Sequence, residues 1–296
     1  MNAQALVVLS LKASIFLTVL GFGLLATRED LLYVWRRPGL LGRSLVAMFL
    51  IMPLVAVFLV KQFAYQQAVD IALVALAISP VPPLLPRRVT QSGGRTPFGL
   101  GMMVTAAVLS IVFIPLALHM IGQFEHRSFT MTPGAIARLI GMSVLLPVAA
   151  GMLLRKVSPQ FATRIVKPVS KFAIVLLLLS VLPVLVKVFP VAWSLIGDGT
   201  IIGIMAFIVA GLIVGHLLGG PNPDERVTLA LLTACRHPAL ALAIATANFP
   251  DQKRVVGAIV LYLLLNMLMA IPYVSWQRRV RARANDAGHG PTKLAA

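Results

Sequence analysis

Two short basic stretches interrupt hydrophobic runs of this 296-residue chain, and they hold the residues best suited to chemistry. The first, Ser79–Arg95, carries four prolines, then Arg87 and Arg88, then a Gly-Gly pair. The second is Arg236-His237-Pro238. A charge at the bilayer centre costs roughly 2.5–3.5 kcal/mol on insertion scales, so such residues normally face a cavity and a partner. Guanidinium groups there would bind an anionic group, and a histidine could carry a proton.

Both stretches predict broken membrane helices. Proline removes a backbone donor and clashes with the preceding turn, so the prolines end each helix. Backbone groups freed at membrane depth are tolerated only where protein or a water-filled cavity satisfies them. Thr90, Gln91 and Ser92 add neutral hydrogen-bonding groups beside the first break.

Each of these residues also has an ordinary structural interpretation. Arg87 and Arg88 could be loop charges that orient the chain, and the hydroxyls could be helix caps. Arg236 could form a structural ion pair or snorkel near the interface, and His237 could be a satisfied core histidine. Asp70, the only acid near a span of the core half, is a candidate partner for a base near a span end; those bases are Lys12, His119, Lys187 and His216.

Composition predicts an all-α membrane protein with several spans. The chain is 59% hydrophobic and 12% charged, whereas soluble domains are about 45–50% apolar and about 25% charged. Its net charge of +17 lies mostly in loops and the tail, which indicates membrane orientation and not nucleic-acid binding. One cysteine excludes a disulfide framework. Without GxSxG, HExxH or P-loop motifs, we expect no enzyme and no metal or other cofactor.

Apolar runs of membrane-spanning length predict about nine transmembrane helices. The spans are about 5–26, 40–60, 69 into the proline stretch, 98–122, 135–154, 168–188, 200–218, 227 through the second break, and 255–276. Basic loops place the N-terminus outside and the C-terminus in the cytoplasm of a bacterial cytoplasmic (inner) membrane. Residues 1–283 form a single membrane domain, and residues 284–296 form a disordered cytoplasmic tail. Six glycines around the seventh span predict close helix packing.

The two broken spans are the third and the eighth, and each is followed by one further span. Matching interruptions in two halves are typical of a transporter binding site at a repeat interface. Because five spans separate the breaks, we predict an inverted repeat of five helices whose first half lacks its first helix.

Three segments carry a resemblance to the bile acid:sodium symporter (BASS) family. They are Arg37-Pro38 followed by LLGRSLVAMFLIMPLVAVFLVKQF, then ALVALAISP, and later TACRHPALALAIATANF. The resemblance implies a divergent nine-helix member with two broken helices that cross. It also implies panel helices at about 5–26, 135–154 and 168–188, core helices at about 40–60, 69–122 and 200–276, and alternating access between the two groups.

The chain departs from the family at the oxygens that the resemblance implies for sodium. Met48 stands where the family has a glutamine, and Leu85-Pro86 stands where it has a Ser-Asn pair. In the second break, Leu232 replaces a glutamate, and Arg236-His237-Pro238 replaces a Gln-Asn-Ser run. One hydroxyl remains, as Thr105. Hard cations need several oxygen ligands. We therefore expect no sodium coupling by the family's usual mechanism, and instead a fixed positive charge for an anion.

The sequence thus predicts a secondary transporter that moves a small organic anion across the bilayer. Its substrate-binding candidates are Arg236, His237, Arg87, Arg88, Thr90, Gln91, Ser92 and Thr105, with proton coupling through His237. One alternative is a sodium symporter with rearranged ligands, and another is a non-transporting sensor or assembly protein of the same fold. Whether the chain forms a homo-oligomer stays open.

Overall fold

The computed structural model describes residues 3–63, 65–125, 129 and 131–288, and every regular element in them is helical. The elements are α1 (Ala3–Leu25), α2 (Arg28–Leu32), α3 (Pro38–Leu45), η1 (Val46–Ile51), α4 (Met52–Gln62), α5 (Gln67–Ile78), α6 (Leu85–Gln91), α7 (Thr96–Glu125), α8 (Pro133–Ile140), η2 (Gly141–Leu145), α9 (Leu146–Val157), α10 (Pro159–Trp193), α11 (Thr200–Leu218), α12 (Pro223–Ala234), α13 (Pro238–Asn248) and α14 (Val255–Gly288). The all-helical class is therefore confirmed.

Eight helices in the described residues are long and apolar enough to cross a membrane, and the short apolar helix α5 makes up the ninth predicted span. α5 and α6 form the broken third span, while α12 and α13 form the broken eighth. About nine spans with breaks in the third and eighth are consistent with the prediction. The inverted repeat stays a prediction.

Two spans bend through π-helical segments that directly precede a proline. The segment η1 comes just before Pro53, and η2 comes just before Pro147. A proline ring clashes with the carbonyl of the preceding turn, and a wider turn relieves that clash. Widening leaves some carbonyls without their usual helical donor, and that of Met48 in η1 is one of them.

Helix ends differ from the predicted spans where proline is tolerated. α10 begins at Pro159 and runs through Pro168, at which the sixth span was expected to begin. Proline suits the first turn of a helix, and neighbouring groups satisfy the carbonyls it frees inside a membrane helix.

The last helix, α14, continues to Gly288, into the segment 284–296 for which disorder was predicted. The remainder of that segment, 289–296, lies outside the described residues.

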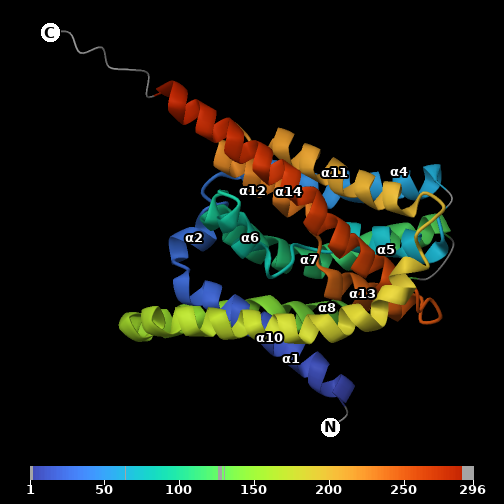
Figure 1. The fold of residues 1–296 in the computed structure, drawn as a ribbon, viewed down its shortest axis with the longest axis horizontal. Helices are drawn as coiled ribbons and strands as arrows, with labels where there is room; N and C mark the ends of the chain where they lie inside the picture. The colour runs from blue at the N-terminus through green and yellow to red at the C-terminus, as the bar shows by residue number, and fades with distance from the viewer. Residues whose placement is uncertain (1–2, 64, 126–128, 130, 289–296) are drawn as a thin grey trace.

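The helices form two groups (Figure 1). One group contains α1, α9 and α10, which pack on one another, and α8, which leads into α9 through η2 and contacts α7; in this group Gly23 and Gly151 let α1 approach α9 closely. The second group holds the remaining long helices. We call the end of the bundle where α1 begins the N-terminal end, and the opposite end, with α2 and α6, the α2 end (Figure 1).

Glycines line the contact between α11 and α12, as the sequence predicts. A Cβ at Gly211, Gly215 or Gly219 would run into the α12 backbone. With no side chain at these positions, the helices pack backbone against backbone up to Ala234, the last residue of α12. The second break begins directly after that residue.

Candidate functional site

The first break follows α5, which ends at Ile78. Pro80, Pro82 and Pro83 cannot donate backbone hydrogen bonds, so the chain leaves the helix after Ile78 and passes through a turn at Pro83 and Leu84 before α6 begins at Leu85. Ser79 is fully buried at this point, and its hydroxyl donates to the carbonyl of Ala75 over 2.6 Å. The main-chain carbonyls of the break therefore need donors from other elements.

The second break lies between α12 and α13 and meets the first. Pro238 begins α13, and the Nδ1 atom of His237 accepts a hydrogen bond from the amide of Leu240 over 3.3 Å. The amide of His237 donates to the carbonyl of Pro80 over 2.9 Å. The two broken helices are thus joined directly at their breaks, with His237 acting as a helix cap.

Arg236 supplies the missing donors. Its side chain is buried, with 1% of the residue exposed. Nη1 donates to the carbonyl of Ser79 over 3.3 Å, and Nη2 donates to the carbonyl of Met48 over 3.1 Å. The first carbonyl lies just past the C-terminal end of α5, where the helix dipole is negative, and the second lies in η1. Arg236 therefore holds two backbone oxygens from different spans.

No acid neutralises Arg236 in the part of the chain that the structure describes. The one ion pair there joins Arg37 to Glu225. The Nε atom of Arg236 is buried and has no hydrogen-bond partner among the described residues. Within the described residues Arg236 therefore lacks the acidic partner that a structural ion pair would need, and its charge faces carbonyl dipoles.

α14 completes the crossing. The hydroxyl of Tyr262 donates to the carbonyl of Ala234 over 2.6 Å and accepts the amide of Arg236 over 2.9 Å. The side-chain amide of Asn266 also donates to the Ala234 carbonyl, over 2.9 Å. From α6, Arg88 donates to the Oδ1 atom of Asn266 over 2.8 Å and to its carbonyl over 3.0 Å. Arg88 and Arg236 thus flank one network at the end of α12.

The other predicted site residues have different surroundings. Arg87 is half-buried on α6, and Ser92 is buried at its end. The hydroxyl of Thr90 donates to the carbonyl of Pro86 over 2.9 Å, and the Gln91 carbonyl accepts a hydrogen bond from Arg278. Thr105 accepts a hydrogen bond from the indole of Trp35 over 3.1 Å. Thr90 and Thr105 thus contact partners other than Arg236 and His237.

Four of the positions at which the resemblance implies sodium ligands hold buried apolar residues. Met48 and Leu232 are fully buried, as are Leu85 and Pro86. No side-chain oxygen can come from these four residues. In their place, the Met48 and Ser79 carbonyls face the Arg236 guanidinium.

A cavity that the sequence did not indicate lies at the N-terminal end, among α4, α5, α7 and α13. Its volume is about 480 Å³. Its polar lining residues are Gln67, Asp70 and Asn248. Asp70 was a candidate partner for a base near a span end, but one of its oxygens is buried and has no hydrogen bond within the described residues. The surroundings of Asp70 depend on four helices, so no local signal could have revealed them.

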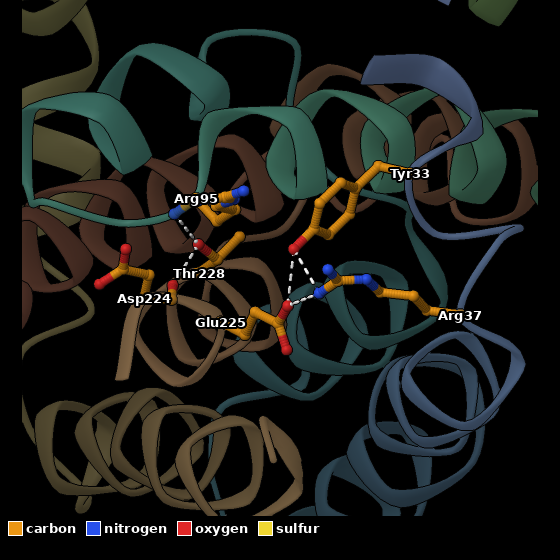
Figure 2. A network of polar contacts seen from close by, with 6 residues as sticks. All are labelled: Tyr33, Arg37, Arg95, Asp224, Glu225 and Thr228. Atoms are coloured by element: carbon orange, nitrogen blue, oxygen red, sulfur yellow. Dashed lines mark hydrogen bonds and ion pairs between the residues drawn. The ribbon is translucent and has the colours of Figure 1, made fainter. Parts of the chain in front are cut away.

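A polar network closes the α2 end of the crossing. Figure 2 shows Tyr33 and Arg37 pointing toward Glu225, while the backbone of Arg95 faces Thr228. The Tyr33 hydroxyl donates to Glu225 over 2.6 Å, Arg37 pairs with the same carboxylate, and the Arg95 amide donates to Thr228 over 2.7 Å. Burial raises the pKa of Tyr33, and the hydrogen bond to Glu225 raises it further. This network ties the segment after α2 to the start of α12.

These features define a helical membrane protein in which two broken helices meet at their breaks. Residues 13–189, more than half of the chain, match the model of the Sodium Bile acid symporter family. The chain belongs to that family. The match ends before α11, so the Arg236 break lies beyond it. No curated protein matches the chain.

Proposed function

We propose that the chain is a secondary transporter in which Arg236 takes the place of the coupling sodium ion. It would move a small organic anion across the bacterial inner membrane by alternating access between its two helix groups. The observation that carries the proposal is the pair of hydrogen bonds from Arg236 to the carbonyls of Ser79 and Met48.

The chemistry of the guanidinium supports this substitution. A bound sodium ion needs several oxygens around it, and it leaves and returns with each transport cycle. A guanidinium offers five donors and stays charged, so it can hold backbone oxygens permanently. An ion that is covalently part of the chain cannot be drawn from a gradient. Transport through this crossing would therefore not require sodium.

The charge balance favours an anionic guest near the crossing. Arg88 and Arg236 contact carbonyl, amide and thiol groups within the described residues, and the neighbouring Cys235 donates its thiol to Asn266 over 3.1 Å. Two uncompensated positive charges in a low-dielectric region raise the local potential. A carboxylate that reached this region on rearrangement of the helices would be stabilised there.

His237 offers a second mode of coupling. Its Nδ1 atom caps α13 by accepting the Leu240 amide, which requires that nitrogen to be unprotonated. Protonation at Nδ1 would remove the cap and weaken the start of α13 beside the break. A proton gradient could therefore shift the crossing between two arrangements.

Uptake into proteoliposomes tests the proposal. Radiolabelled bile acid and smaller carboxylates are offered with an inward sodium gradient, with potassium in its place, and with a proton gradient. The proposal expects equal uptake in sodium and potassium. A strict sodium requirement would instead support a symporter with rearranged ligands. Absence of uptake for every anion, with the protein correctly inserted, would support a non-transporting role.

A further inference from the structure

We propose that the cavity at the N-terminal end binds an organic ammonium group carried on an apolar body, with Asp70 as its counter-ion. This inference concerns binding alone, and it does not depend on how transport is coupled at Arg236.

The cavity has the size and character of a small-molecule site. Its volume of about 480 Å³ falls within the usual range of about 300–1,000 Å³ for ligand pockets. Most of its lining is apolar, and the larger aliphatic side chains are Ile71, Val74, Ile78, Leu118, Ile121 and Ile244. An apolar lining with a few convergent polar groups is typical of sites that hold an amphipathic molecule.

Asp70 gives the cavity its charge. It is the only acid among the described lining residues, and none of these residues is basic. Its Oδ1 atom is buried without a hydrogen bond in the described part of the chain. An ionised carboxylate oxygen that is buried and unpaired is costly, and a positively charged donor removes that cost.

Basic groups on the neighbouring elements do not fill this role. α13 carries none, and Lys61 at the end of α4 is exposed. His119 of α7 hydrogen-bonds Gln123 instead, over 3.1 Å. Lys253 and Arg254, in the turn after α13, are exposed. Among the described residues, Asp70 therefore has no basic partner, and a bound ammonium group would supply one.

The lining favours an organic cation over a metal ion. Gln67 and Asn248 are the other polar side chains among its described lining residues, and the described residues hold no cluster of three or more potential metal ligands. Calcium, for example, takes six to eight oxygens. The rings of Phe129 and Phe249, with centroids 5.4 Å apart, belong to the same lining. Aromatic faces attract ammonium groups, which are weakly hydrated when alkylated.

This site and the arginines at the crossing suit opposite charges. A simple anion would be repelled by Asp70, whereas a zwitterion could place its ammonium group here and its acidic group toward the breaks. A plain cation would use this cavity only. The shared requirement is the ammonium group.

Calorimetric titration of the purified chain in detergent tests the inference. Three probes share a benzyl body: benzyltrimethylammonium, the zwitterion N,N,N-trimethylphenylalanine, and the anion 3-phenylpropionate. We expect one or both ammonium probes to bind and the anion not to bind. Asp70→Asn should weaken ammonium binding by about tenfold or more, because it removes the charge partner. The matched control Asp251→Asn removes an exposed acid near the same end and should leave binding unchanged.

A preference for the zwitterion would identify an amino-acid-like guest, and binding of both ammonium probes alike would identify a plain cation; either result supports the inference. Val74→Phe fills the cavity but keeps Asp70, so it should abolish binding even if Asp70→Asn does not fold. Equal affinity in Asp70→Asn or Val74→Phe, binding of phenylpropionate as tight as that of the cation, or no binding of either ammonium probe would overturn the inference.

Discussion

The amide of His237 donates a hydrogen bond of 2.9 Å to the carbonyl of Pro80, which joins the two broken helices at their breaks. Arg236, one residue earlier, holds the carbonyl of Ser79, one residue before Pro80. Two adjacent residues of one break therefore satisfy two adjacent carbonyls of the other. Since α5 and α12 both end here, the crossing depends on a charged side chain as well as on main-chain contacts.

Replacing Arg236 should expose this dependence. Arg236→Ala removes two hydrogen bonds from a charged donor, each with a net value of about 1.5–3 kcal/mol, and it leaves two buried carbonyls unpaired. We expect a large fall in melting temperature and partial recovery with millimolar guanidinium, which can fill the vacated place. The control is Arg87→Ala, which removes a half-buried arginine of α6, and its melting temperature should not recover with guanidinium. Loss of stability without any rescue would show that the side chain acts through packing alone.

Tyr262 should matter for its hydroxyl, whereas Tyr65 should not. Tyr262→Phe leaves the Arg236 amide without its acceptor and removes one of the donors to the Ala234 carbonyl, at a cost of about 1–3 kcal/mol. The Tyr65 hydroxyl is buried without a hydrogen bond among the described residues, so Tyr65→Phe should be neutral or stabilising. Chemical unfolding of both variants in the same detergent checks this contrast. Equal effects would argue against the Tyr262 contacts.

The backbone contact between α11 and α12 should reject any side chain. A Cβ at Gly215 would run into the backbone of Leu229 and Ala230, so Gly215→Ala should destabilise the chain. Gly42→Ala is the matched control, since a Cβ there meets open space within α3. It should be neutral or stabilise by up to about 1 kcal/mol. Melting temperatures of the two variants, measured side by side, decide the matter.

Glu225→Gln should loosen the network at the α2 end. The change replaces a carboxylate that pairs with Arg37 and accepts a hydrogen bond from the Tyr33 hydroxyl by a neutral amide. Because burial and then Glu225 raise the pKa of Tyr33, this pKa should fall toward its ordinary value of about 10, with part of the rise retained through burial.

A raised pKa in the folded state favours the protonated phenol. Its contribution to stability is present below the ordinary pKa and is lost as the pH rises above it. The wild-type chain should thus lose stability at alkaline pH more steeply than Tyr33→Phe does. Absorbance titrations of the wild-type chain and of Glu225→Gln, each with the Tyr33→Phe curve subtracted, give the Tyr33 pKa by difference. An unchanged Tyr33 titration in Glu225→Gln would contradict the network.

The breaks could be predicted from sequence because proline acts locally. Pro80 follows the end of α5 and Pro238 begins α13, and the basic residues near them mark the same places, whereas an isolated proline such as Pro168 is tolerated within a helix. The partners of Arg236 could not be predicted, because the Met48 carbonyl becomes available only where a π-helical segment and a distant break come together. The sequence singled out Asp70 as an acid near a span. The cavity beside it could not be predicted, because it is formed by four helices that meet only in the folded chain.

Equilibrium binding of radioactive sodium to the purified chain tests the central claim about Arg236 most directly. Wild-type protein is titrated with ²²Na⁺ at constant ionic strength, with unlabelled potassium as competitor. If the guanidinium permanently occupies the place of the coupling ion, wild-type protein should show no saturable sodium binding. Saturable, potassium-resistant sodium binding by the wild-type chain would contradict the account.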